Sequence, residues 1–237
     1  MSVRFGWILG LVVALLGLPS VALAAMQCAV PSAIRPMKAE RPPPGRTVSA
    51  SVTGHILALS WSPQFCKEHR GEKKHAAQCE GQNFGFILHG LWADGESFND
   101  PQWCKRVTPV PVEVMRQTFC ATPSLTLMQH EWAKHGSCIE SDPGRYFRAA
   151  TQAYDAIRYP DIDALARKEI DVGDFVAAFV AVNPGLTADM VRIDQTPLGY
   201  LQELRICLDR SYRPRACPSD IGGSGAGSRL RITPVGR

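Results

Sequence analysis

Two histidines, a glutamate and a lysine lie within the nine residues 130–138, HEWAKHGSC. The imidazole of histidine titrates near neutral pH, so it can donate or accept a proton in catalysis, and it is also a common metal ligand. Two imidazoles beside a carboxylate and an ammonium group therefore point to acid–base chemistry or to a metal site. The spacing of the two histidines distinguishes these possibilities.

The spacing disfavours a zinc site. In the zinc-protease motif H-E-x-x-H, the two histidines are separated by about 40° around a helix. Here the second histidine comes one residue later, so His130 and His135 differ by roughly 140°. The sequence also has no histidine after His135 that could serve as a third ligand. We therefore expect neither a metal ion nor another cofactor.

A helix terminus is the simplest alternative for this segment. Lysine and histidine before a glycine offset the negative end of the helix dipole, and Gly136 is a natural stop for a helix. However, His130, Glu131, Lys134 and His135 all fall within one arc of roughly 140°. Capping does not require that arrangement, so we interpret the arc as a catalytic face.

A second candidate segment is FILHGLWADG, residues 86–95, in which a histidine follows a short apolar run. Taken alone, His89 is typical of an ordinary residue at the end of a strand. Together with the helical face at 130–135, it supplies another imidazole on a rigid element. The two segments then provide an acid and a base of the same chemical type.

The elements that would position these residues are strands near both ends of the chain and helices between them. Aliphatic alternation predicts strands at 55–63, 84–92, 200–209, 213–218 and 229–234, the third and fourth forming a hairpin. Helical patterns cover 111–119, 124–135, 142–158 and 171–182, with Ser124 and Asp142 as caps. Strands at both ends of a helical middle predict an α+β fold, in which several helices pack on a central antiparallel sheet.

The N-terminal residues are typical of an export signal. Residues 1–24 contain Arg4, an apolar run and small residues at Ala22 and Ala24, so we expect cleavage after Ala24. The apolar run is short for a membrane anchor. Loss of Arg4 would reduce the formal net charge from +4 to +3, a mildly basic value that suits a polyanionic partner. Residues 25–51 are rich in proline and basic side chains, and residues 52–237 form the predicted single domain.

Eight cysteines follow the predicted signal, at positions 28, 66, 79, 104, 120, 138, 207 and 217. An even number of cysteines in an exported chain predicts disulfide bonds, because the periplasm and the extracellular space are oxidising. Spacing alone leaves about 105 pairings open. Cys66 and Cys79 bracket the charged segment CKEHRGEKKHAAQC. We interpret that segment as a solvated loop, with weak binding of phosphate groups by Lys73 and Lys74 as the alternative.

The two histidine segments resemble the signature blocks of the ribonuclease T2 family, which read close to HGLWP and HEWxKHGTC. Here they are HGLWA and HEWAKHGSC. LSWSPQFC, DPQWC and RICLDRSYRPRACP are also similar to segments of that family, in the same order, so the resemblance extends over about residues 55–217. Ala93 replaces a usual proline and Ser137 a usual threonine. Neither change removes a titrating group.

The resemblance implies roles for seven residues. His135 would be the general base and His89 the general acid, although the two labels could be exchanged. Lys134 and Glu131 would stabilise the pentacoordinate phosphorane, and His130 would hold the phosphate. Trp92 would pack against the ribose or a base, and Asp94 would contact that base. The implied disulfides are Cys66–Cys79, Cys104–Cys138 and Cys207–Cys217, with Cys28 and Cys120 as the remaining pair.

The implied activity is metal-independent cleavage of single-stranded RNA, since the ribose 2′-hydroxyl is itself the nucleophile. The products would be a 2′,3′-cyclic phosphate and then a 3′-phosphate. Two alternatives are a catalytically inactive, disulfide-rich protein that binds RNA or another partner, and a metal-dependent hydrolase. We expect a secreted or periplasmic monomer, with RNA as its partner and no stable membrane association.

Overall fold

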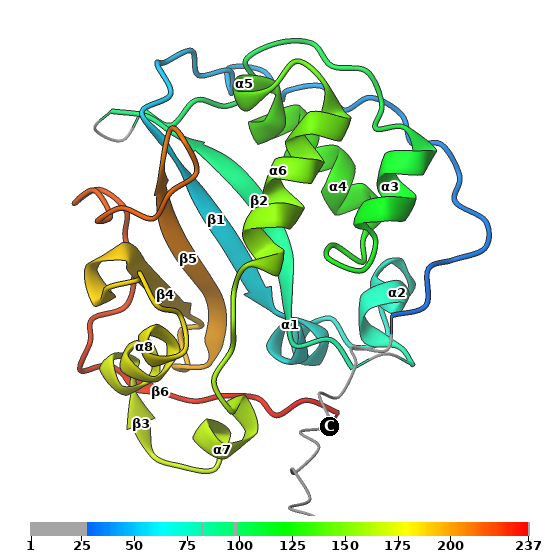
Figure 1. Cartoon of the computed structure of the whole chain (residues 1–237). Helices are drawn as coiled ribbons and strands as arrows, with labels where there is room; N and C mark the ends of the chain where they lie inside the picture. Colours follow the sequence, from blue (N-terminus) through cyan, green and yellow to red (C-terminus); the bar gives the residue numbers. More distant parts are fainter. Residues whose placement is uncertain (1–27, 82, 97–98, 237) are drawn as a thin grey trace, which may run out of the picture.

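The computed structural model describes residues 28–81, 83–96 and 99–236, so the predicted signal sequence lies outside the described residues. Four strands form one antiparallel sheet in the order β2-β1-β5-β4 (Figure 1). The strands are β1 (Gly54–Trp61), β2 (Phe86–Asp94), β4 (Val191–Gln195) and β5 (Leu201–Asp209). This arrangement confirms the predicted α+β fold with a central antiparallel sheet. It also adds β4, which the pattern of apolar residues did not reveal.

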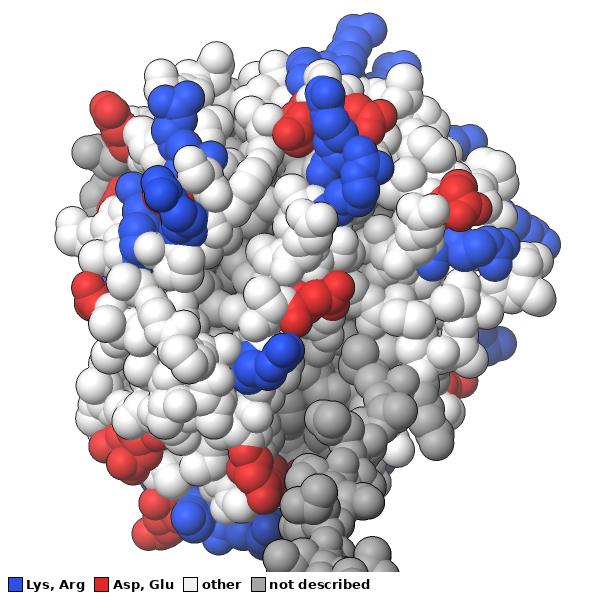
Figure 2. All heavy atoms as spheres, in the orientation of Figure 1, with Lys and Arg blue, Asp and Glu red and all other residues white. Residues whose placement is uncertain are grey.

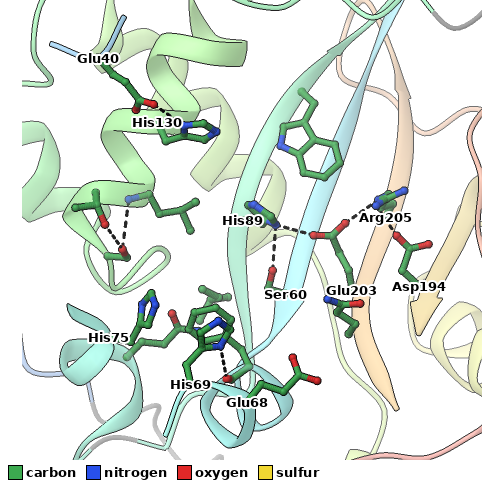
Figure 3. A pocket seen from close by; sticks show the side chains of 18 residues that line it. Glu40, Ser60, Glu68, His69, His75, His89, His130, Asp194, Glu203 and Arg205 are labelled. Atoms are coloured by element: carbon green, nitrogen blue, oxygen red, sulfur yellow. Dashed lines mark hydrogen bonds and ion pairs between the residues drawn. The ribbon is translucent and has the colours of Figure 1, made fainter. Parts of the chain in front are cut away.

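The two faces of the sheet differ because side chains alternate along each strand. In β5, Leu204, Ile206 and Leu208 are buried in the main core. Glu203 and Arg205 point to the opposite face, which is the one that carries the candidate site (Figure 3).

Helices cover the core face of the sheet. They include α3 (Val112–Thr118), α4 (Leu125–Glu131), α6 (Pro143–Asp155) and α8 (Val172–Ala181). The predicted caps are present: the Ser124 hydroxyl accepts a hydrogen bond from Leu127 N, and the Asp142 carboxylate accepts one from Arg145 N. Tyr146 and Phe147 of α6 are both buried in the core. Helices α3, α6 and α8 confirm the helices predicted at 111–119, 142–158 and 171–182 to within three residues at each end. The helix predicted at 124–135 is confirmed as far as Glu131, where α4 ends.

The first predicted strand ends earlier than expected. Strand β1 stops at Trp61, and residues Ser62–Glu68 form helix α1, with Pro63 in its first turn. Proline is well accommodated at the start of a helix because its missing N–H has no partner there. The segment between Cys66 and Cys79, predicted as a loop, then forms a 3₁₀ turn at Lys73–His75 and the short helix α2 at Ala76–Cys79.

Gly136 does not terminate the helix as predicted. After α4 the chain makes a π-helical turn at Trp132–Gly136 and continues into α5 (Ser137–Ile139). A Cβ atom on Gly136 would lie 2.5 Å from the Trp132 ring and 3.0 Å from the Tyr146 ring. Glycine is needed there for close packing, which the sequence pattern alone did not distinguish from a helix stop.

The C-terminal strands are shorter than predicted. Residues 213–218 contribute only a bridge between Leu208 and Pro214, because proline has no N–H with which to extend a ladder. The last predicted strand is reduced to β6 (Arg229–Leu230), which pairs with β3 (Ile170–Asp171) in a separate small sheet. The remaining elements are α7 (Ile162–Ala166) and a 3₁₀ turn at Ala188–Met190.

The four disulfides are the pairs that the resemblance implied: Cys28–Cys120, Cys66–Cys79, Cys104–Cys138 and Cys207–Cys217. Cys28–Cys120 ties the N-terminal segment, blue in Figure 1, to the end of α3. Over the described ranges, we find no helix that combines the length and the apolar character needed to cross a bilayer.

Candidate active site

A β-bulge places His89 on the open face of the sheet. Ala58 of β1 pairs with Gly90 and Leu59 with Leu88, so His89 is the extra residue on β2. The extra residue reverses the alternation: Leu88 and Leu91 both face the core although they are three positions apart. His89 and Trp92 therefore face the same cleft, also at a spacing of three. Bulges commonly re-aim side chains at active sites.

His89 is held by groups from β1 and β5 (Figure 3). Its Nδ1 lies 2.6 Å from Glu203 Oε2 and 3.1 Å from the Ser60 hydroxyl. Burial by itself lowers the pKa of His89, but the hydrogen bond to Glu203 and the charges of Glu131 and Glu203 outweigh it and raise the pKa above its usual value. The imidazole is therefore held in its protonated form to a higher pH than a free histidine.

Arg205 connects this pair to the rest of the sheet. Its Nε donates to Glu203 Oε1 at 2.7 Å, and its guanidinium also forms an ion pair with Asp194. The guanidinium carbon lies 5.2 Å from the centre of the Trp92 ring, within the range of a cation–π contact. This network fixes the Glu203 carboxylate, and through it the orientation of the His89 ring.

Gly90 of β2 allows this strand and helix α4 to approach closely. Trp92 Nε1 donates a 2.8 Å hydrogen bond to Glu131 Oε2, directly over Gly90. A Cβ on Gly90 would lie only 2.0 Å from Glu131 Oε2 and 2.8 Å from Trp92 Nε1. Glu131 is 2% exposed, and this burial raises the pKa of its carboxyl group despite the attraction of His89 and His130. Its Oε1 lies 3.7 Å from His89 Nε2.

His135 lies on the other side of the same indole. Its ring stacks on Trp92 with 5.4 Å between centroids and 26° between planes, and the residue is 5% exposed. Its Nδ1 has no hydrogen-bond partner among the residues that the structure describes. Burial, followed by the charges of Lys134, His130 and His89, lowers the pKa of His135 to about 2. His135 is therefore a neutral imidazole, whereas the pKa of the nearby His89 is raised.

His130 meets a residue that the sequence did not single out. Its Nδ1 lies 2.9 Å from a carboxylate oxygen of Glu40, and its ring meets the Trp103 ring edge-on at 5.5 Å. Lys134 is half-buried, and its backbone oxygen accepts a 2.7 Å hydrogen bond from Trp103 N. The Lys134 charge opposes the effect of burial on the pKa of Glu131 and adds to the effect of burial in lowering the pKa of His135.

These residues surround a cleft of about 740 Å³. Of the predicted site residues, His89, Trp92 and His130 line it, whereas Glu131 and His135 lie behind Trp92 and outside the lining. The loop between Cys66 and Cys79 forms the far end of the cleft through His69 and His75 (Figure 3). Phe65, His69 and His75 contact one another as rings, so the two histidines are half-buried. Lys73 and Lys74 are exposed, as predicted for a solvated loop.

Asp94 is the predicted site residue that lies apart from the others. It is 1% exposed and forms an ion pair with Arg215, near the other end of β2. Burial raises the pKa of the Asp94 carboxyl, and the charge of Arg215 opposes this effect. Its carboxylate does not line the cleft, so the structure gives no support to base recognition by Asp94.

The two departures from the family blocks are both accommodated. The Ser137 hydroxyl donates to Ala133 O at 2.8 Å and accepts from Cys104 N at 3.2 Å, so serine supplies the hydroxyl contacts at this position. Ala93 is 1% exposed within β2 and is paired with His55. Neither residue lines the cleft.

Five residues that line the cleft were not predicted from the sequence: Glu40, Ser60, Asp194, Glu203 and Arg205. The sequence contains a signal for two of these residues, Glu203 and Arg205. In LQELRICLD, Glu203 and Arg205 alternate with Leu204, Ile206 and Leu208, which places two charges on one face of a central strand. Charged residues there require partners, and in this structure those partners are His89 and Asp194.

Charge is mixed over the molecular surface. Figure 2 shows basic and acidic side chains interspersed on one face, without a large area of a single sign. No group of three or more histidine, cysteine or acidic side chains within the described ranges is arranged to hold a metal ion.

The fold is an antiparallel sheet covered by helices and linked by four disulfides, and its cleft is lined by histidines. These features define a disulfide-stapled α+β protein. A model of the Ribonuclease T2 family matches residues 53–217, and the chain belongs to this family. A probable ribonuclease of Haemophilus influenzae is 31% identical over 187 residues, which are 74% of this chain and 64% of that protein. A ribonuclease of Aeromonas hydrophila is 40% identical over 85 residues, 35% of this chain and 36% of that protein. The chain thus spans less than two thirds of each relative.

The fold also matches that of solved structures. Trichomaglin, described as an S-like ribonuclease, superposes with a TM-score of 0.63 at 18% identity, covering 78% of this chain and 98% of trichomaglin. At this level of identity the match shows a shared fold. The activity of the present chain must be argued from its own site.

Proposed function

We propose that this protein is a metal-independent endoribonuclease that cleaves single-stranded RNA. The observation that carries the proposal is the pair His89 and His135, which contact the same indole and have their pKa values shifted in opposite directions. Two titratable groups whose environments separate their pKa values are the usual arrangement for a general acid and a general base.

The first step is a transesterification. A base removes the proton of the ribose 2′-hydroxyl, and the resulting oxygen attacks the adjacent phosphorus. The bond from phosphorus to the 5′-oxygen breaks, and an acid protonates that oxygen as it leaves. The product is a 2′,3′-cyclic phosphate. In the second step water opens the ring to a 3′-phosphate, with the two histidines exchanging roles.

The pKa directions support one assignment of these roles. The raised pKa of His89 keeps it protonated, as the general acid for the first step must be. The lowered pKa of His135 keeps it in the neutral form that a general base requires, and relief of its burial would restore its basicity. Because Trp92 covers His135, the base can reach a 2′-hydroxyl in the cleft only when the indole moves aside. Trp92 would then pack against the ribose or a base.

The developing charge on the phosphorane would be stabilised by three neighbours. Lys134 would supply an ammonium group, and His130, which lines the cleft, would hold the phosphate. Fixed donors of this kind contribute on the order of a few kcal/mol each to transition-state stabilisation. Glu131 accepts a hydrogen bond from Trp92 and lies behind that ring, so it would reach the phosphorane only when the indole moves aside.

The substrate class follows from the nucleophile. DNA lacks the 2′-hydroxyl, so we expect it to bind without being cleaved. The N-terminal export pattern and the four disulfides support a secreted or periplasmic location. We expect the protein to act as a monomer.

The decisive experiment is digestion of RNA and DNA by the purified mature protein in the presence of EDTA. It is repeated with His89→Phe and His135→Phe, and thermal unfolding of each variant checks that it is folded. We expect RNA cleavage in EDTA with accumulation of cyclic phosphate, no cleavage of DNA, and losses of at least about a hundredfold in both variants.

Each alternative gives a different result in this experiment. Loss of activity in EDTA would favour a metal-dependent hydrolase. RNA binding without cleavage would favour an inactive binding protein. Retention of full activity in either folded histidine variant would refute the assignment of that residue.

A further inference from the structure

Glu40 reaches the cleft from a part of the chain that lies outside the family match. The match covers residues 53–217, whereas Glu40 belongs to the preceding proline-rich segment. Its carboxylate accepts a 2.9 Å hydrogen bond from His130 Nδ1, and both side chains line the cleft (Figure 3). The histidine that would hold the phosphate therefore has an acidic partner from outside the matched region.

The segment that carries Glu40 is anchored on both sides of it. On the N-terminal side, Cys28 is bonded to Cys120, and Ile34 is buried in the main core. Arg116 of α3 donates hydrogen bonds to the backbone oxygens of Pro31 and Ser32. On the C-terminal side, Val48 exchanges two backbone hydrogen bonds with Gln102, at 3.0 and 3.1 Å. These anchors hold the backbone around Glu40 against the body of the domain.

The hydrogen bond determines how His130 presents its ring. A carboxylate accepts hydrogen bonds only, so the Nδ1 atom carries the proton in this pair. In the protonated ring Nε2 carries the second N–H, which is the donor left for a ligand. The His130 side chain is 38% exposed, so its ring can meet a ligand in the cleft. A carboxylate that orients a ligand-binding histidine in this way is a recurrent arrangement in proteins.

We propose that Glu40 is a positioning residue for His130. It holds the imidazole with Nδ1–H toward the N-terminal segment and leaves Nε2–H to donate to a phosphate oxygen in the cleft. The inference rests on the proposed function, in which that phosphate belongs to RNA. It assigns part of the phosphate-binding apparatus to a segment that the family match does not include.

If Glu40 competed with the phosphate instead of positioning His130, its removal would have the opposite effect on phosphate binding. A carboxylate beside a phosphate-binding histidine could instead occupy the place of the phosphate and compete with it. Removal of a competing group would tighten binding of anions, whereas removal of a positioning group would weaken it. The sign of the effect therefore distinguishes the two.

The test compares Glu40→Ala and Glu40→Gln with the wild-type full chain. We expect KM for a short RNA substrate to rise about tenfold in Glu40→Ala while kcat changes much less, because one charge-assisted hydrogen bond is lost. Glu40→Gln keeps an acceptor but not the charge, and should show a smaller rise. Glu113→Ala is the matched control, since Glu113 lies on α3 outside the cleft and bonds only Gln117 among the described side chains.

Two further measurements separate positioning from a structural effect. In a His130→Ala background, Glu40→Ala should cause no additional rise in KM. The ¹⁵N shifts of His130 should show a protonated Nδ1 in the wild type and a mixture of tautomers in Glu40→Ala. An unchanged or lowered KM in folded Glu40→Ala would overturn the proposal, as would a further rise in the His130→Ala background.

Phosphate binding tests the role of Glu40 independently of RNA cleavage. Binding of inorganic phosphate, followed through the His130 resonances, requires no catalysis. If the wild type cleaves no RNA, the proposed function fails, yet weaker phosphate binding by Glu40→Ala would still support the role of Glu40. Equal phosphate binding by both proteins would overturn it even when RNA is cleaved.

Discussion

His89 and His135 are the same residue type in opposite surroundings. His89 has the Glu203 carboxylate at 2.6 Å from its Nδ1, and this partner together with the charge of Glu131 outweighs the cost of burial. His135 is stacked under Trp92, and its Nδ1 meets no partner within the described ranges, so burial dominates. The difference in pKa thus arises from neighbours on β2 and β5 rather than from the histidines themselves.

Replacement of Glu203 tests the cause of the raised pKa of His89. In Glu203→Gln the negative partner is lost, so the pKa of His89 should fall. The general acid would then lose its proton at lower pH, and the alkaline limb of the kcat/KM–pH profile should move to lower pH. Glu169→Gln, at an exposed ion pair with Arg229, is the control. An unmoved alkaline limb in Glu203→Gln would show that another group sets it.

Removal of the Trp92 side chain tests the cause of the lowered pKa of His135. In Trp92→Ala the imidazole becomes accessible to water, so its pKa should rise from about 2 toward the ordinary value of about 6.5. Titration of the His135 ring protons by NMR measures this directly. A pKa that stays near its original value would mean that the neighbouring positive charges, and not burial, keep the ring neutral.

At the scale of secondary structure, two irregularities assemble the site. The bulge in β2 turns His89 and Trp92 toward the cleft, and the π-helical turn continues α4 so that Glu131 and His135 both contact Trp92. Bulges and π-helical turns are found often at functional sites, where regular geometry would misplace a side chain. Gly90 and Gly136 permit the close packing that both irregularities require.

Gly90→Ala should disrupt this contact between strand and helix. The new methyl group would overlap Glu131 Oε2 and press on the Trp92 indole. We expect a loss of about 1–3 kcal/mol in the free energy of unfolding, together with a large loss of RNA cleavage. Gly222→Ala is the matched control, because nothing lies within 4 Å of a Cβ at that position. Equal stability and activity of both variants would show that the close approach is unimportant.

Loss of the Cys104–Cys138 disulfide, which follows the π-helical turn, should reduce activity while the protein still folds. Cys138 joins the short helix α5 to Cys104, next to the contacts made by Ser137. In the double variant Cys104→Ala/Cys138→Ala, we expect kcat/KM to fall more than about tenfold while thermal unfolding stays cooperative at a lower midpoint, since such a bond contributes about 2–4 kcal/mol. Full activity at the wild-type midpoint would count against this role.

At the scale of the whole molecule, the cleft draws on parts of the chain that are distant in sequence. Its lining comes from the N-terminal segment and from β1, β2, α4 and β5, which contribute Glu40, Ser60, His89, His130 and Glu203 respectively. The Cys28–Cys120 bond closes the longest disulfide-linked span of the described chain, with a separation of 92 residues. That bond attaches the segment bearing Glu40 to the helical layer, and so links the N-terminal extension to the site.

Much of this protein was determined by local sequence. Alternation in 55–63 and 200–209 predicted the two central strands, and the Ser124 and Asp142 caps located two helices, because period and capping depend on neighbouring residues. The two histidine segments marked the site for the same reason, since their residue types and spacing are local. The resemblance of those segments also implied the four disulfide pairs.

Tertiary structure alone decided which residues meet in space. Nothing local to His89 indicated that Glu203, 114 positions later, would set its charge, or that Trp92 would bury His135. Asp94 is adjacent to the site in sequence yet pairs with Arg215 outside the cleft, whereas Glu40 is distant yet bonds to His130. Charge states depend on burial and on partners across strands, and only the packed sheet and helices determine these.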